Sequence, residues 1–340
     1  MVSGAKYFYK FVANDVKTAS FTATMGLRNN KGEDMITYLR SSVDQPVITE
    51  HDSLKAGTWV RSERPSDDEK QSLVDLGIDE SILADALDPH EVPRIEYDDG
   101  WTYFITRVPD VGDDFNDYTT PILFALNKNK TVTLSRDPLG RLWQPFIEKT
   151  QVNTGNQTEL FLTMIEMILQ SYQTRVALIN RQMRAATSDI VSLNPKDIAT
   201  FVEYERKLND YLDALIPTNT ALEKTLNQKF KFISLKEEDQ EMVEDLSVDI
   251  EQVIARCKSL LRTITNLRDS YRAVMDTRLN ETIRLLTVVT LAFTVPTMIA
   301  GLFGMNVEIP GEHLPYIFWV ILVVSLVVSG SLAYYFLRKK

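Results

Sequence analysis

The sequence predicts an α+β fold: an N-terminal cytoplasmic α/β domain, followed by a long stalk helix that continues into the first of two C-terminal transmembrane helices. Three observations predict this fold. Short β-rich runs separated by turn residues occupy residues 1–150. Glycine is then absent from residue 156 to residue 300, where apolar residues recur with helical spacing. Finally, the stretches 285–307 and 314–337 contain no charged residue.

Composition excludes several classes of protein. The chain has 340 residues, of which 44% are hydrophobic, so it can form a folded core. Its formal net charge of −10 argues against a broadly basic surface for nucleic acid and suits a cationic partner. One cysteine and three histidines cannot form a disulfide framework or a closed Cys/His zinc site. The sequence has no P-loop, dinucleotide-binding, H-E-x-x-H or G-x-S-x-G motif, so we do not expect an enzyme.

The α/β domain is predicted to span residues 1–150. Within it, Ser66-x-x-Glu69 matches a capping box directly after Pro65, and Gly77 follows a segment with helical apolar spacing. These residues predict a helix that begins after Ser66 and ends before Gly77. Runs rich in β-branched and aromatic residues predict strands at Tyr7–Val12, Thr58–Arg61, Trp101–Val108, Ile122–Leu126 and Thr131–Leu134.

Residues 151–234 are predicted to form a cytoplasmic helical hairpin. The pair Asn194-Pro195 should separate its two helices, because the residue before a proline is disfavoured in the helical conformation. Pro217 is expected to kink or interrupt the second helix, since it has no backbone N–H to donate to the preceding turn.

The stalk helix is predicted over residues 235–284. No glycine or proline intervenes before Pro296, so one helix should run from Leu235 into the membrane, with about 65 residues and a length of about 100 Å. A heptad-like coiled-coil seam along it requires a partner, which could be other helices of the same chain, copies of itself, or both. The seam residues are Leu246, Ile250, Val253, Cys257, Leu260, Ile264, Leu267, Tyr271 and Val274.

Residues 285–307 and 314–337 are predicted to be transmembrane helices, joined by an extracellular loop at 308–313. Each run can cross about 30 Å of hydrocarbon, which favours membrane spans over a pair of buried core helices. Arg284 precedes the first run, a basic tail at 338–340 follows the second, and the loop has no lysine or arginine. Because lysine and arginine are retained on the cytoplasmic side, we expect a multi-pass protein of the cytoplasmic membrane with both termini in the cytoplasm.

The first transmembrane helix carries a polar stripe. Thr287, Thr290, Thr294 and Thr297 are spaced by three, four and three, which places their hydroxyls on one helical face. Such a threonine can also bond to the carbonyl four residues before it, or mediate helix packing. Four aligned hydroxyls favour a hydrated path, and one helix cannot enclose a pore, so this interpretation requires an oligomer. The same stripe continues toward the cytoplasm through Ile283, Asn280 and Asp276.

The end of this helix reads Phe303-Gly304-Met305-Asn306, shortly before the second span. In this position Gly-Met-Asn resembles the hallmark of the CorA-type divalent-cation channel family. The segment 87–108, LDPHEVPRIEYDDGWTYFITRV, is similar to the cytoplasmic α/β domain of that family, and residues 280–287 are similar to its pore entrance. The resemblance implies a funnel-shaped homopentamer, in which five first spans line the pore and five second spans face lipid.

The resemblance also implies roles for individual residues. Gly304, Met305 and Asn306 would form the selectivity filter. Because Mg²⁺ gives up its water reluctantly, the Asn306 side-chain carbonyl oxygens would accept hydrogen bonds from the water molecules bound to the ion. A regulatory Mg²⁺ would bind between neighbouring cytoplasmic domains, at Asp98 or Asp99 on one side and Asp245 on the other. The remaining candidates are Asn280, Ile283 and Leu286 at the cytoplasmic constriction, Thr294 and Thr297 along the ion path, and Glu308 and Glu312 at the outer mouth, where carboxylates attract cations.

Together these features predict a homopentameric Mg²⁺ uptake channel, driven by the membrane potential and gated by cytoplasmic Mg²⁺. Its partners would be divalent cations and membrane lipid, and not nucleic acid. The loop between the spans lacks the Met-Pro-Glu-Leu sequence of well-known family members, which leaves a zinc, cobalt or nickel transporter of the same fold as an alternative. A second alternative is a two-span signalling or scaffolding protein whose stalk binds a cytoplasmic partner.

Overall fold

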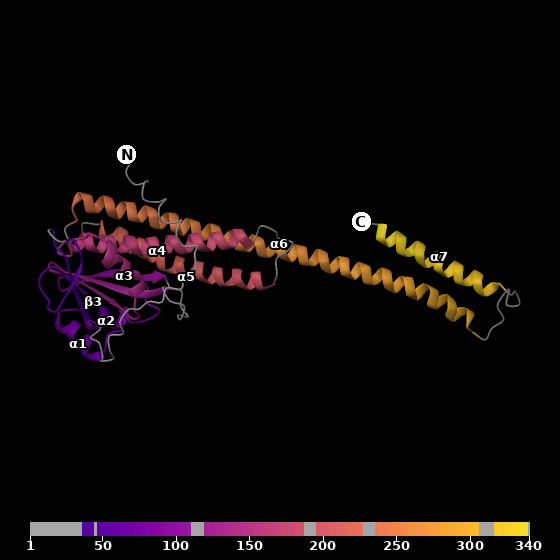
Figure 1. Cartoon of the computed structure of the whole chain (residues 1–340), viewed down its shortest axis with the longest axis horizontal. Coiled ribbons are helices and arrows are strands. Elements are labelled where there is room, and N and C mark those ends of the chain that lie inside the picture. The colour runs from indigo at the N-terminus through magenta and orange to yellow at the C-terminus, as the bar shows by residue number, and fades with distance from the viewer. Residues whose placement is uncertain are drawn as a thin grey trace, which may run out of the picture. The chain divides into compact units, whose positions relative to one another are not determined.

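The computed structural model describes residues 36–43, 46–109, 119–186, 195–226, 235–305 and 316–338 (Figure 1). The strand expected at Tyr7–Val12 lies outside the described residues, as do the candidate residues Asn306, Glu308 and Glu312. Along the chain, a β-sheet with short helices comes first and long helices follow, as Figure 1 shows.

The sheet is built from the strands β1 (Ile36–Arg40), β2 (Thr49–His51), β3 (Thr58–Glu63), β4 (Arg94–Asp98), β5 (Trp101–Pro109), β6 (Thr119–Leu126) and β7 (Lys130–Ser135). Their order across the sheet is β2-β1-β3-β7-β6-β5-β4. β3 and β7 are parallel, and the other neighbouring pairs are antiparallel. The four strands predicted after residue 50 are confirmed as parts of β3, β5, β6 and β7.

Helices cover both faces of the sheet. Alternate residues of β5 and β6 point to opposite sides: Phe104 and Phe124 belong to one apolar cluster, while Tyr103 and Leu123 belong to another. Both strands are therefore almost wholly buried. The helices α1 (Asp67–Asp75) and α2 (Glu80–Ala86) pack on the Tyr103 side, and α3 (Gly140–Lys149), α4 (Gln157–Ala186) and α5 (Pro195–Thr225) pack on the Phe104 side.

The predicted capping box at the start of α1 is confirmed. The backbone N–H of Glu69 donates to Ser66 Oγ at 3.3 Å, and the backbone N–H of Ser66 donates to Glu69 Oε2 at 2.7 Å. Gly77 follows the helix with φ +104°, a conformation that glycine adopts without strain. A Cβ at Gly77 would lie 3.2 Å from Trp101 Nε1, so this turn also needs glycine for space.

α5 begins at Pro195, as predicted, but it is not interrupted at Pro217. A proline inside a helix removes one backbone hydrogen bond. Around Pro217, the side chains of Leu215 and Thr218 are buried, and the Thr218 hydroxyl lies 2.7 Å from the Thr106 hydroxyl of β5. Tertiary packing against the sheet thus holds the helix together where local propensity would end it.

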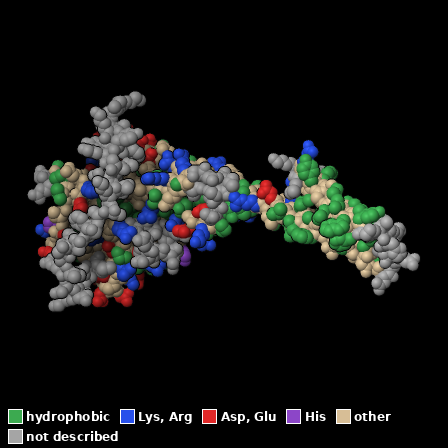
Figure 2. Space-filling model, turned by 45° about the vertical axis from the view of Figure 1, so that its right-hand side comes forward, with side chains coloured by type: hydrophobic (Ala, Val, Ile, Leu, Met, Phe, Trp, Pro, Cys, Tyr) green, Lys and Arg blue, Asp and Glu red, His purple; other side chains and the backbone are tan. Residues whose placement is uncertain are grey.

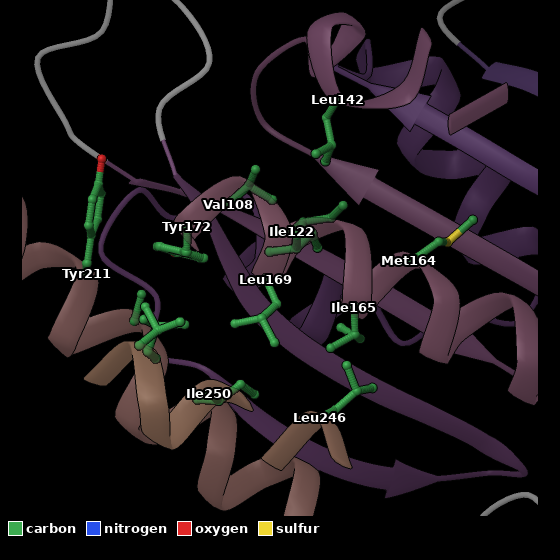
Figure 3. Close-up of a cluster of buried hydrophobic side chains, with 14 of the residues drawn as sticks. Val108, Ile122, Leu142, Met164, Ile165, Leu169, Tyr172, Tyr211, Leu246 and Ile250 are labelled. Carbon is green, nitrogen blue, oxygen red and sulfur yellow. The ribbon is translucent and has the colours of Figure 1, made fainter. Parts of the chain in front are cut away.

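The long helix α6 (Glu237–Phe303) has 67 residues and continues from its contacts with α4 and α5 into the apolar run, as predicted. The seam residues from Leu246 to Leu267 are buried, and they pack against α4 and α5 of the same chain. Figure 3 shows Leu246 and Ile250 of α6 in one cluster with Ile165 and Leu169 of α4. The structure therefore supplies an intrachain partner for this part of the seam, which the spacing alone does not identify.

Candidate functional site

Among the described residues, two helices have the length and composition to cross a membrane: α6, in its apolar part beyond Arg284, and α7 (Ile317–Arg338). Only 6% of the apolar window of α6 and 11% of that of α7 is buried within the chain. Apolar side chains gather over this part of the molecule in Figure 2, whereas charged side chains are scattered among other types over the rest of the described surface in that view. An apolar surface of this extent requires lipid or other subunits, so the alternative of two buried core helices is wrong.

α6 and α7 contact each other through both apolar and polar groups. Beyond Arg284, the more buried side chains of α6 include Val288, Leu291 and Val295, which mark the face that packs on α7. On this face the Ser329 hydroxyl of α7 donates to the Ala292 carbonyl at 2.7 Å. At the other end of the contact, Arg284 donates to the Phe336 carbonyl from Nε at 3.1 Å and also from Nη2. These bonds fix α7 along α6.

The four threonines of the polar stripe, Thr287, Thr290, Thr294 and Thr297, are all exposed on the single chain. At about 100° per residue, their face is turned away from the face that packs on α7. The hydroxyls of Thr287, Thr290 and Thr297 each donate to the carbonyl four residues before, at 2.8 Å. Since the only hydroxyl proton of each is used in this bond, the oxygen can offer only its remaining acceptor capacity to a neighbouring group.

The stripe continues toward the N-terminal part of α6 on its exposed side. Asp276 and Asn280 are exposed, Ile283 is 52% exposed and Leu286 is 65% exposed. Within the part of the chain that the structure describes, nothing buries these two large apolar side chains. One chain brings the stripe residues into line but encloses no path, so any pore must be completed by further copies.

The C-terminal end of α6, and the residues directly after it, are described as far as Met305. Gly304 caps the helix, and its backbone N–H donates to the Ala300 carbonyl at 3.0 Å. A Cβ at Gly304 would lie 3.3 Å from that carbonyl oxygen, so a larger residue would crowd the cap. Met305 is 57% exposed. The remaining residue of the predicted filter, Asn306, lies outside the described residues.

The candidate regulatory residues are exposed in two separate elements. Asp98 ends β4 and pairs with Trp101, and the intervening Asp99 and Gly100 have φ of +40° and +80°, as in the two-residue turn of a tight hairpin. Asp245 lies on α6, directly before the buried Leu246. Within the part of the chain that the structure describes, no group of three or more Asp, Glu, His or Cys side chains could hold a metal ion. A site shared by neighbouring chains is not tested by a single chain.

Ser329 is a residue of this site that the sequence pattern did not predict. The available signal was a pair of serines, Ser325 and Ser329, spaced by four in an otherwise apolar span. Both are more than nine-tenths buried. Polar residues in a membrane helix commonly face another helix and hydrogen bond to it, so this spacing could have predicted the contact with α6.

Comparison with known proteins identifies the family. The family model described as "CorA-like Mg2+ transporter protein" matches residues 55–339. The chain belongs to this family. The resemblance inferred from Gly304-Met305-Asn306 is therefore confirmed. Because the family consists of transporters, the expectation that the chain is not an enzyme is also confirmed.

Individual relatives agree with this assignment. The chain is 25% identical over 287 residues to the cobalt/magnesium transport protein CorA of Methanocaldococcus jannaschii, a match that covers 82% of this chain and 90% of the relative. The complete structure of the CorA magnesium transporter from the same organism superposes with a TM-score of 0.75 at 22% identity, covering 90% and 98% of the two chains. The cytoplasmic domain of ZntB from Vibrio parahaemolyticus matches with a TM-score of 0.59 at 11% identity, over 71% and 99%. These structural matches confirm the α/β domain and the long helix.

Proposed function

We propose that this chain assembles into a homopentameric channel for Mg²⁺ uptake across the cytoplasmic membrane, with both termini in the cytoplasm. Membership of the CorA-like family supports transport of Mg²⁺. The observation that carries the proposed path is the exposed threonine stripe of α6, which points away from α7. With α6 around a central axis and α7 outside it, the stripes of several copies would face one another and the apolar faces of α7 would meet lipid.

The hydrogen bonds of the stripe suit a hydrated cation. Mg²⁺ holds its water strongly, and the water molecules of its first shell present protons outward. Thr287, Thr290 and Thr297 have already committed their own protons to backbone carbonyls. Their oxygens would therefore act as acceptors of hydrogen bonds from the water molecules bound to the ion. This arrangement favours passage of an ion that remains hydrated over one that must be stripped.

The other site residues have proposed roles at successive levels of the path. The Asn306 side-chain carbonyls would accept hydrogen bonds from the water of the hydrated ion at the outer end, next to Gly304 and Met305. The exposed apolar Ile283 and Leu286 would close the cytoplasmic end by excluding water. Asp276 and Asn280 would lie at the cytoplasmic entrance, Thr294 along the path, and Glu308 and Glu312 at the outer mouth.

A flux experiment tests the stripe. In proteoliposomes with an internal Mg²⁺ indicator, Thr290→Val should reduce Mg²⁺ entry about tenfold, because it replaces an acceptor in every subunit with a methyl group of similar shape. Thr290→Ser should retain entry. The matched control is Thr282→Val, which removes another exposed, back-bonded hydroxyl from α6 outside the stripe. Equal flux in Thr290→Val and wild type would contradict the proposal, and Asn306→Ala should abolish selective entry.

The metal preference is tested in the same vesicles by competition. The relative from Methanocaldococcus jannaschii is named a cobalt/magnesium transport protein, which supports Co²⁺ as a second substrate. Mg²⁺ entry that is blocked by Co²⁺ but not by Zn²⁺ would support this preference. Faster entry of Zn²⁺ or Ni²⁺ than of Mg²⁺ would favour the alternative transporters of the same fold. If the protein transports no divalent ion in this assay, the result would favour the alternative of a signalling or scaffolding protein.

We also propose that intracellular Mg²⁺ gates the channel at an intersubunit site formed by Asp98 or Asp99 and Asp245. These carboxylates are exposed on the single chain and are thus accessible to a neighbour. Bound Mg²⁺ would offset the repulsion between them, and its loss would favour opening. Limited proteolysis with and without millimolar Mg²⁺ tests this role. Protection by Mg²⁺ should be lost in Asp245→Asn, and unchanged cleavage of the wild type would contradict regulation.

A further inference from the structure

The pore-side helix α6 contains a proline in its membrane part, and yet it continues. Pro296 has no backbone N–H, so the carbonyl of Ala292, four residues before it, has no donor within the helix. α6 nevertheless extends without interruption to Phe303. In a membrane a carbonyl without a donor is costly, because no water is present to replace the missing bond.

Ser329 of α7 supplies the missing donor. Its hydroxyl lies 2.7 Å from the Ala292 carbonyl oxygen, and the side chain is 5% exposed. Ala292 is about 10 Å along α6 from the start of the apolar run at Leu285, and Ser329 is about 14 Å along α7 from Arg338, at 1.5 Å per residue. Both groups therefore lie well inside a hydrocarbon layer of about 30 Å.

The neighbouring Ser325 shows that this bond is specific. Ser325 is equally buried, at 4% exposure, but its hydroxyl donates to the Leu322 carbonyl of its own helix at 2.8 Å. The two serines are one turn apart on the same face of α7. Only the one opposite Ala292 reaches across to α6, where the carbonyl released by Pro296 is available.

We propose that Ser329 is a positioning residue for the ion path, which keeps α6 straight enough through Pro296 for its threonine stripe to remain continuous. Thr287, Thr290 and Thr294 precede Pro296, and Thr297 follows it directly. Without the bond, α6 can bend at Pro296, as helices do at prolines, and Thr297 and the Gly304 end turn out of line. Only the expected effect of Ser329 on ion transport rests on the proposed function. The bond itself is independent of the ion carried.

A double-mutant cycle tests the proposal in the full-length protein in lipid. Ser329→Ala should speed hydrogen exchange of the backbone amides at 293–300 about tenfold, and should lower Mg²⁺ flux at least fivefold, because the Ala292 carbonyl loses its donor. In the Pro296→Ala background, Ser329→Ala should change either quantity less than about twofold, since residue 296 then donates its own N–H. Ser329→Thr retains a hydroxyl and should retain flux. Ser325→Ala is the matched control, with no dependence on residue 296.

Three outcomes decide the matter. Equal effects of Ser329→Ala in both backgrounds would overturn the bond between Ser329 and the proline site. Coupling in hydrogen exchange with unchanged flux and unchanged Mg²⁺ over Co²⁺ preference would overturn the positioning role. If the wild type carries no ion, the proposed function fails, but the exchange cycle still shows whether Ser329 supports α6 at Pro296.

Discussion

Truncating Ile264 tests whether the seam of α6 is used within the chain. Ile264 is fully buried in the cluster formed by α6 with α4 and α5. Ile264→Ala removes three carbon atoms, at about 0.8 kcal/mol each, and leaves a cavity that neighbouring side chains fill only in part. We expect a loss of about 3 kcal/mol in the local free energy of opening, which corresponds to about a hundredfold in an equilibrium constant.

Hydrogen exchange read by mass spectrometry measures this loss directly. Amides of α6 around Ile264, and those of the α4 and α5 segments packed on it, should exchange about a hundredfold faster in Ile264→Ala. The matched control is Thr265→Ala, because Thr265 is exposed next to Ile264 and should change exchange by less than about threefold. The effect should be the same at high and low protein concentration. If Ile264→Ala instead dissociates the oligomer and leaves α4 and α5 protected, the seam packs between copies and the reasoning is wrong.

Three further predictions concern single side chains. Burial raises the pKa of the Cys257 thiol to about 12, whereas an unfolded thiol ionises near a pH of about 8.5. Stability should therefore fall with rising pH above about 8.5, where only the unfolded thiol loses its proton, and Cys257→Ala should lack this component in urea titrations. Ser66→Ala should lower the free energy of opening of α1 by about 1 kcal/mol, because it removes the acceptor for the Glu69 N–H. Hydrogen exchange of the α1 amides measures this loss. Arg284→Gln should leave the Phe336 carbonyl without its guanidinium donor, and exchange in the last turn of α7 should rise several-fold while the middle of α7 is unchanged.

Much of the fold could be predicted from the sequence because local chemistry decides it. The capping box at Ser66 specifies a helix start through contacts within four residues. The long apolar runs specify membrane helices through length alone. The buried strands β5, β6 and β7 are recognisable because they are rich in β-branched and aromatic residues, which pack well on a sheet. The Gly304-Met305-Asn306 motif indicates the family by its residues and by its position between two apolar spans, both of which are properties of the sequence.

Other elements could not be predicted because their sequences carry little pattern. β1, β2 and β4 are short and partly exposed, and β2 is exposed throughout its three residues. The helix α2 has only 7 residues, too few turns to show a clear period, and α3 contains Pro145, which opposes a helix locally. Pro217 opposes a helix locally, but packing around Leu215 and Thr218 outweighs that preference. In each case contacts with distant parts of the chain select the structure.

The sequence by itself determined that this chain has an N-terminal α/β part, one very long helix, two membrane helices and a threonine stripe, because periodicity, length and end signals act along the chain. Only the tertiary structure decided which surfaces meet. It placed Ile264 and the rest of the buried seam against α4 and α5, turned the threonines away from α7, and set Ser329 opposite the carbonyl that Pro296 leaves without a donor. The physical reason is that a helix period marks a face but not its partner, since packing and interhelical hydrogen bonds join residues far apart in sequence.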